Sequence, residues 1–171
     1  TARVSASLQA FNSALIASGI KYASIEEVMQ KSDIVTLHVP SLPSTHHLIN
    51  AHLLSLMKPT AYLINSARGE IVDTQALVDA LKNKQIAGAG LDVLEGERFL
   101  AKEEELTSEQ KQDPKIVVLL SLDHTLIDLP NVVVTPHIAF NTREAKNEIT
   151  QVTLQNIVGF INGEPINQIP L

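Results

Sequence analysis

The 171-residue sequence contains no cysteine, no apolar run long enough to cross a membrane, and no cluster of basic residues. Without cysteine the chain can form neither disulfides nor thiol sites, which fits a reducing cytoplasm. A membrane span needs roughly 18 consecutive apolar residues, and the first residues lack the basic-then-apolar order of a signal peptide. The net charge of −6 leaves no positive stripe for nucleic acid phosphates. We therefore expect a cytoplasmic protein that binds neither membranes nor nucleic acids.

The residues that are present predict one α/β domain. Apolar residues make up 44% of the chain and charged residues 19%, as in ordinary globular proteins. Short β-branched runs predict strands at residues 34–39 (IVTLHV), 61–64 (AYLI), 86–93 (IAGAGLDV) and 132–134 (VVV). Apolar residues three and four apart predict helices at residues 25–29, 52–57 and 74–81. Alternation of strands and helices is typical of a parallel sheet with helices on its faces, which binds ligands beyond the carboxyl ends of its strands.

The sequence after residue 97 departs from this alternation. Residues 98–113 (RFLAKEEELTSEQKQD) are mostly charged and predict a solvated surface excursion, at most with a short exposed helix. The last helix is expected to start at Asn141, whose side chain would cap it while Glu144 reaches back, and to run to Gly163. Pro165 prevents its continuation.

Three residues whose side chains could take part in catalysis follow three different predicted strands. Arg68 can present a planar fork to a carboxylate, although a lone arginine is more often in a surface salt bridge. His137 can exchange a proton near neutral pH, although a lone loop histidine is more often merely exposed. Glu97 could fix the tautomer of an imidazole, and Glu95 is an equally good candidate for that role. Asp92 ends a strand rich in small residues, which suggests that a ligand or another backbone segment approaches the strand closely there. Parallel strands bring these ends to one edge, so the combination favours a site more than any residue alone.

Four ordered motifs resemble the D-isomer-specific 2-hydroxyacid dehydrogenases. The motifs are SDIVTLHVPSLPSTHHLIN (32–50), MKPTAYLINSARGEIVD (57–73), GLDVLEGE (90–97) and LPNVVVTPHIAFNTREA (129–145). Together they cover much of the chain. The HIAFNT sequence and the long insertion after LEGE are similar to the D-lactate dehydrogenase branch.

The resemblance implies an oxidoreductase that transfers a hydride between NAD(H) and a D-2-hydroxy acid or 2-oxoacid, similar to D-lactate and pyruvate. It implies that Arg68 holds the substrate carboxylate, that His137 exchanges the proton, and that Glu97 is its partner. Phe140 would wall the substrate pocket. Residues implied to line the cofactor are Val39, Pro40 and Thr45 on the adenine-ribose side, and Ser66, Ala67 and Asp92 near the nicotinamide. We predict no metal site.

The sequence departs from the family pattern before Ser32. Family members carry a G-x-G-x-x-G turn there, and this sequence has none. The family's acidic ribose-binding residue is expected near Leu8, but no acid precedes Glu26, so NADP is not excluded. We expect residues 1–171 to be the C-terminal part of a dinucleotide-binding domain: a Rossmann-type parallel sheet, incomplete at its N-terminal end, without the first βα unit or the substrate-binding domain. The 171 residues alone are expected to show little turnover.

Two other function classes fit the same sequence. The C-terminal binding protein corepressors resemble this family and act mainly through protein partners, so an NAD-binding interaction module is the alternative to an enzyme. Assays of peptide binding, compared with assays of catalytic turnover, would discriminate between the two. A purely structural domain is the third class. For an enzyme, the resemblance implies a small-molecule 2-oxoacid or 2-hydroxyacid partner and a homodimer.

Overall fold

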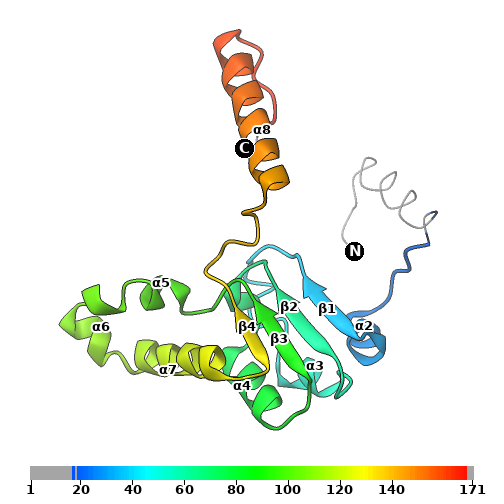
Figure 1. The fold of residues 1–171 in the computed structure, drawn as a ribbon, viewed down its shortest axis with the longest axis vertical. Coiled ribbons are helices and arrows are strands. Elements are labelled where there is room, and N and C mark those ends of the chain that lie inside the picture. Colours follow the sequence, from blue (N-terminus) through cyan, green and yellow to red (C-terminus); the bar gives the residue numbers. More distant parts are fainter. Residues whose placement is uncertain (1–16, 18, 169–171) are drawn as a thin grey trace.

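A four-stranded parallel sheet organises the chain in the computed structural model, which describes residue 17 and residues 19–168 (Figure 1). The strands follow one another across the sheet in chain order as β1 (Ile34–Leu37), β2 (Tyr62–Asn65), β3 (Gly88–Leu91) and β4 (Val132–Val134). Leu37 lies opposite Asn65, and Asn65 opposite Leu91. All four carboxyl ends therefore lie along one edge. The predicted α/β class is confirmed, and the expectation about Leu8 falls outside the described residues.

The strand positions agree with the sequence patterns, but three sets of bounds do not. The strand predicted at residues 34–39 ends at Leu37, the one at 61–64 starts and ends one residue later, and the one at 86–93 covers only Gly88–Leu91. The strands end at Leu37, Asn65 and Leu91, which lie opposite one another, so the apolar residues beyond them belong to the loops. The strand at residues 132–134 has the predicted bounds.

Only one face of the sheet is covered within the described part of the chain. Side chains such as Val35, Leu63 and Leu91 are buried on that face. On the other face Ile34 and Val133 are 64% and 68% exposed. The helices that contribute to the core are α2 (Ile25–Lys31), α3 (Ala51–Ser55), α4 (Thr74–Lys82) and α7 (Pro114–Asp128). The sequence predicts helices on both faces, as parallel sheets usually require. Within the described residues, helices cover one of these two faces.

Short polar residues cap the starts of α2, α3 and α4. Ser24 accepts a hydrogen bond from the Glu27 N–H before α2, and Asn50 caps α3 in the same way. Asp73 caps α4 by accepting from the Ala76 N–H at 3.0 Å. Caps of this kind are worth about 1 kcal/mol each. The predicted helices are confirmed, with bounds that differ by a few residues.

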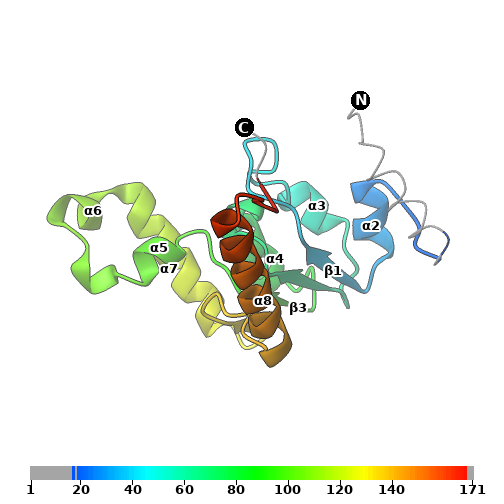
Figure 2. The same ribbon diagram turned by 90° about the horizontal axis from the view of Figure 1, so that it is seen from above.

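The charged segment after β3 contains more helix than the sequence predicts. It forms α5 (Glu97–Leu100), a 3-10 turn η2 (Glu103–Glu105) and α6 (Ser108–Gln112), and the longer α7 follows it. Figures 1 and 2 show this segment beyond β4, at the opposite end of the sheet from α2. The sequence analysis missed α7 because its apolar residues are too continuous for a helical period, although Asp113 caps it and Pro114 follows as its first residue.

The last helix, α8 (Arg143–Ile161), starts later than predicted and extends away from the sheet (Figure 1). Its cap is Thr142, whose hydroxyl accepts from the Ala145 N–H at 3.1 Å. The prediction of Asn141 was wrong because the Asn141 N–H donates to the Ile138 carbonyl in the preceding turn. No residue of α8 is buried. Among the described residues, no helix is both long and apolar enough to span a membrane.

Candidate active site

A buried asparagine shapes the loop that carries Arg68. The amide nitrogen of Asn65 donates to the Arg68 carbonyl at 2.9 Å, and its amide oxygen accepts from the Ala67 N–H at 3.0 Å. Asn65 is only 1% exposed, so these bonds satisfy a group that would be costly to bury alone. The sequence analysis missed Asn65. Its signal was a polar residue at the end of an otherwise apolar strand.

Gly69 holds this loop against the turn that follows β3. A Cβ atom built on Gly69 would overlap the backbone of Leu94 and Glu95. Only glycine permits so close an approach. The loop of Arg68 and the turn of Glu95 and Glu97 are therefore fixed side by side.

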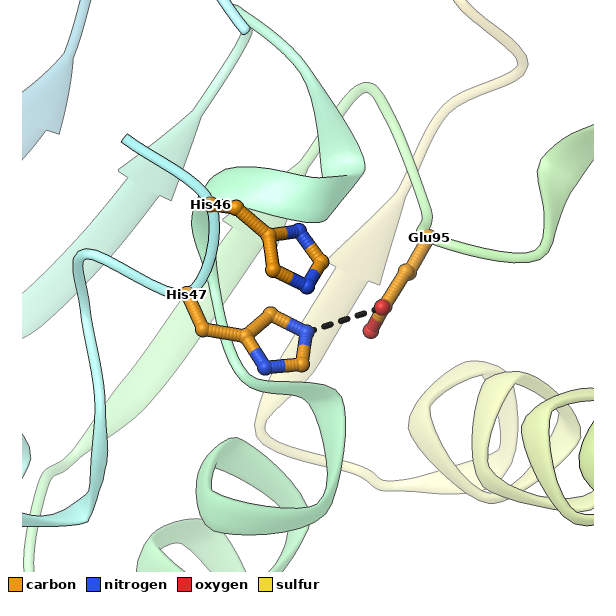
Figure 3. Close-up of side chains that lie close together, drawn as sticks. All are labelled: His46, His47 and Glu95. Atoms are coloured by element: carbon orange, nitrogen blue, oxygen red, sulfur yellow. Dashed lines mark hydrogen bonds and ion pairs between the residues drawn. The ribbon is translucent and has the colours of Figure 1, made fainter. Parts of the chain in front are cut away.

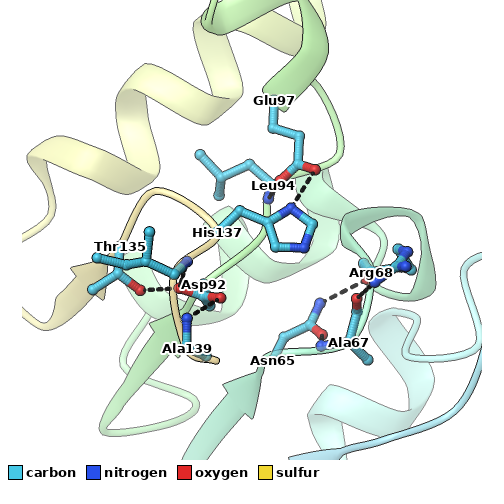
Figure 4. A network of polar contacts seen from close by, with 10 residues as sticks. Asn65, Ala67, Arg68, Asp92, Leu94, Glu97, Thr135, His137 and Ala139 are labelled. Atoms are coloured by element: carbon cyan, nitrogen blue, oxygen red, sulfur yellow. Dashed lines mark hydrogen bonds and ion pairs between the residues drawn. The ribbon is translucent and has the colours of Figure 1, made fainter. Parts of the chain in front are cut away.

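The Arg68 side chain is exposed above this edge (Figure 4). One guanidinium nitrogen donates to the Ala67 carbonyl at 2.6 Å. The other guanidinium N–H groups meet no acceptor among the described residues, which leaves a charged fork available to a ligand. A guanidinium in this state is suited to bind a carboxylate through two parallel hydrogen bonds.

Asp92 fixes the turn that carries His137. Its carboxylate accepts from the Thr135 hydroxyl and from the backbone N–H groups of Ile138 and Ala139, at 2.9 and 2.8 Å for the last two. Its backbone carbonyl accepts from the His137 N–H at 2.9 Å. Burial alone would raise the pKa of Asp92, but these hydrogen bonds and the nearby His137 outweigh it and hold the pKa below its usual value. Three of roughly four acceptor positions on the carboxylate are thus filled by the protein.

His137 and Glu97 meet across this edge. His137 Nδ1 lies 3.1 Å from Glu97 Oε1, and the two side chains are 46% and 40% exposed. His137 has a positive φ of 55°, which is uncommon outside glycine and is held here by the bonds of Asp92. The other oxygen of Glu97 accepts from the Leu94 N–H at 3.3 Å. Of the two glutamates that the sequence left open, Glu97 is the one that reaches His137, and Glu95 reaches His47 instead.

A buried acid, Asp123 of α7, supports the turn between the two glutamates. Its Oδ2 accepts from the Gly96 N–H at 3.0 Å, and its Oδ1 has no partner among the described residues. Burial, with smaller contributions from Glu95 and Glu97, raises the pKa of Asp123 to about 7 against the opposing effect of the Gly96 bond. The sequence analysis missed this residue because α7 itself was missed.

A cavity of about 560 Å³ opens beside His137 and Glu97. Its apolar lining comes from Leu94, Leu100, Ala101, Ile127, Val134 and Pro136. Neither Arg68 nor Phe140 lines it. Phe140 is 53% exposed on the segment that leads to α8, so the structure does not bring it to the cavity wall.

The residues predicted to contact a dinucleotide lie at the ends of β1, β2 and β3, along the same edge. The Thr45 hydroxyl donates to the Pro40 carbonyl at 2.7 Å and accepts from the Leu42 N–H, so it shapes the loop after β1. Ser66 is half-buried, and its hydroxyl has no partner among the described residues. Val39 and Ala67 lie on the same two loops as Pro40 and Ser66. An uncommitted hydroxyl, next to close-packed backbone at the carboxyl edge of a parallel sheet, fits a nicotinamide dinucleotide.

This edge brings together a free cationic fork, an imidazole with one uncommitted nitrogen, and a carboxylate on its other nitrogen. Such a set can bind an anionic substrate and move a proton at one atom of it. The arrangement is therefore suited to redox chemistry at a carbonyl, with the hydride carried by a cofactor.

The comparisons with known proteins agree with this geometry. Residues 4–139 match the family model described as "D-isomer specific 2-hydroxyacid dehydrogenase, NAD binding domain". A glyoxylate reductase of Thermofilum pendens is 41% identical over 145 residues, which is 85% of this chain and 37% of that protein.

Solved structures show the same similarity. A D-lactate dehydrogenase from a Sporolactobacillus species has a TM-score of 0.69 at 40% identity, covering 86% of this chain and 42% of its own. The NAD complex of a D-isomer specific 2-hydroxyacid dehydrogenase from Lactobacillus delbrueckii ssp. bulgaricus has a TM-score of 0.73 at 35% identity, covering 99% of this chain and 47% of its own. The chain thus spans less than half the length of each of these proteins.

Proposed function

We propose, since this chain belongs to the D-isomer specific 2-hydroxyacid dehydrogenase family through its NAD-binding domain, that the full-length protein reduces a 2-oxoacid to the D-2-hydroxy acid and catalyses the reverse oxidation. The observation that carries the proposal is the contact of His137 with Glu97 next to the uncommitted fork of Arg68. These are the groups that a 2-oxoacid requires: a cation for its carboxylate and an acid for its carbonyl oxygen.

Each of these residues has a distinct role in this proposal. Arg68 binds the substrate carboxylate and orients the carbonyl. His137 donates a proton from Nε2 to the carbonyl oxygen during reduction and takes it back during oxidation. Glu97 holds the other ring nitrogen, which keeps Nε2 directed at the substrate and places a negative charge beside the ring. Asp92 positions His137 through the turn that it braces. When bound, NADH supplies the hydride and NAD accepts it.

The cofactor contacts follow the same edge. We place the nicotinamide near Ser66, Ala67 and Asp92, and the adenine ribose near Val39, Pro40 and Thr45. The hydroxyl of Ser66 is free to bind a ligand. The chain contains no G-x-G-x-x-G turn, so the contacts proposed for these residues are with the nicotinamide and the adenine ribose and not with the pyrophosphate. The cofactor is NAD, as for the family whose NAD-binding domain this chain matches.

A pyruvate-like substrate is the finer part of the proposal. It is supported by the HIAFNT sequence with Phe140, by the long segment between β3 and α7, and by the D-lactate dehydrogenase similarity. The glyoxylate reductase relative argues for a smaller substrate. The cavity beside His137 has an apolar wall that suits an alkyl side chain.

A panel assay on the full-length protein tests the function directly. NADH oxidation is followed with glyoxylate, pyruvate and larger 2-oxoacids, and the chirality of each product is determined. We expect turnover that yields the D product, with pyruvate among the best substrates. An L product, or no NADH consumption with any 2-oxoacid, would contradict the proposal. Turnover with glyoxylate alone would contradict only the substrate assignment.

We also propose that the full-length protein is a homodimer in the cytoplasm. The support is the family resemblance, together with the row of exposed apolar side chains on α8, such as Leu154, Phe160 and Ile161. Light scattering during size-exclusion chromatography measures the mass in solution. A monomer at micromolar concentration would contradict the dimer.

A further inference from the structure

A second set of imidazole and carboxylate groups lies outside the proposed active site. His46 and His47, in the loop between β1 and α3, lie beside Glu95 of the turn after β3 (Figure 3). One nitrogen or oxygen atom of each of the three side chains lies within 4.8 Å of the others. The prediction from the sequence was that there is no metal site, and His47 and Glu95 are 48 positions apart in the chain.

We propose that His46, His47 and Glu95 form a binding site for a divalent transition-metal ion, with Zn²⁺ as the best fit. Two imidazoles and one carboxylate are a donor set that zinc prefers, whereas Mg²⁺ and Ca²⁺ prefer oxygen ligands alone. Three protein ligands leave the fourth tetrahedral position to water.

Backbone geometry is the first support for this site. Side chains of adjacent residues usually diverge, but the His46 and His47 rings stack with centroids 4.0 Å apart and planes 19° from parallel. His47 has a positive φ of 49°, and its N–H donates to the Glu70 carbonyl at 2.8 Å. This uncommon conformation brings both rings to the same side of the loop.

The orientation of the carboxylate is the second support. One oxygen of Glu95 lies 2.8 Å from His47 Nε2, and the other accepts from the Thr74 hydroxyl at 2.6 Å. Glu95 is 16% exposed, so its position is fixed from both sides. Metal-binding carboxylates are typically held by a hydrogen bond of this kind from outside the ligand shell.

Room to close around an ion is the third support. Ligands of zinc lie about 2.0–2.2 Å from the metal, so their atoms must approach to about 3–4 Å of one another. The His46 ring is exposed and makes no hydrogen bond within the described part of the chain, so it can move inward. The ion would replace the direct contact of His47 with Glu95, and its two positive charges would be partly neutralised by the carboxylate.

The consequence is a bridge between two loops. The metal would tie the loop after β1 to the turn that carries Glu97, two residues beyond Glu95. Binding should therefore stabilise the fold, because an ion that binds only the folded state raises its free energy of unfolding.

Calorimetric titration of the purified, tag-free protein with ZnCl₂ tests the proposal, with Co²⁺ absorption as the structural readout. We expect one Zn²⁺ per chain and a Co²⁺ spectrum of tetrahedral intensity. Binding should weaken from about pH 7.5 to about pH 5.5, because protons compete for imidazole nitrogens. The test measures binding and does not depend on turnover.

Matched variants locate the ion. His46→Gln is the main variant because this exposed ring makes no hydrogen bond within the described part of the chain, and it should weaken Zn²⁺ binding by about tenfold or more. Glu95→Gln should do the same. The control is His124→Gln, which removes the ring from another histidine–glutamate pair, at 2.9 Å from Glu103, that lacks a second imidazole. It should bind Zn²⁺ as the unmodified protein does. Absence of Zn²⁺ binding, or equal binding by His46→Gln and the unmodified protein, would overturn the proposal and leave His47 and Glu95 as an ion pair only.

Discussion

Two glutamates of the same turn contact two different histidines, in unlike surroundings. The Glu95 and His47 side chains are 16% and 36% exposed and lie 2.8 Å apart, with Thr74 on the second carboxylate oxygen. The Glu97 and His137 side chains are 40% and 46% exposed and lie 3.1 Å apart, beside a cavity. Among the described residues, both carboxylates have both oxygens engaged and both histidines keep one ring nitrogen without a hydrogen bond, so the pairs differ in their exposure and in the cavity beside the second pair. The difference separates a pair that holds loops together from a pair that can act on a substrate.

The largest effect is expected for Arg68→Lys in the full-length protein. This variant tests whether the Glu97 side of the turn faces the substrate. Lysine keeps the charge but loses the planar fork. We expect kcat/KM for 2-oxoacid reduction to fall by a factor that corresponds to about 2–4 kcal/mol of transition-state stabilisation. Arg143→Lys, on α8, is the control and should leave kcat/KM unchanged. Near-normal kcat/KM for Arg68→Lys would remove Arg68 from the substrate site.

Asp92→Asn is expected to have the next largest effect. Asparagine keeps one acceptor oxygen but loses the charge that several donors share, and hydrogen bonds to charged groups are worth about 1.5–3 kcal/mol. We expect kcat to fall about tenfold or more because the His137 turn loses its brace, with a smaller rise in KM for NADH because Asp92 also lies beside the proposed nicotinamide position. If KM for NADH rises and kcat is preserved, Asp92 acts mainly on the cofactor and not through His137.

Asp123→Asn probes the support shared by both glutamates. Because the pKa of Asp123 is raised to about 7 in the folded state from the ordinary 3.8, the folded state holds the proton more tightly. Its contribution to stability is complete below about pH 4 and is lost as the pH rises through about 7. The shift corresponds to at most about 4 kcal/mol of unfolding free energy. We expect about 2 kcal/mol to be lost between pH 5 and pH 8, because structural relaxation reduces the cost of burying the charge.

The measurement is urea unfolding of both forms at several pH values. The asparagine variant should be the more stable form at pH 8 and should lose that advantage at pH 5. A difference between the two forms that does not change with pH would show that Asp123 ionises normally.

Local patterns predicted the sheet and the placement of the candidate site at one edge of it. The order of β-branched runs determines the strands, and Arg68, Asp92 and Glu97 follow them directly. The residues alone could not choose between Glu95 and Glu97, because both follow β3 and only the folded turn directs each toward its histidine, whereas the family resemblance implied Glu97. It also could not reveal Asn65, Asp123 or the His46 cluster, since their partners lie in distant segments that meet only through packing.

The most direct test of the account is the pH profile of kcat/KM for 2-oxoacid reduction in Glu97→Gln and Glu95→Gln. Removing the charge of Glu97 makes the protonated His137 ring less favourable, so reduction should lose rate first at alkaline pH while the acidic range is less impaired. The account predicts that the alkaline limb moves to lower pH in Glu97→Gln and stays in place in Glu95→Gln. A limb that moves only in Glu95→Gln, or in neither variant, would contradict the assignment of Glu97 as the partner of the catalytic histidine.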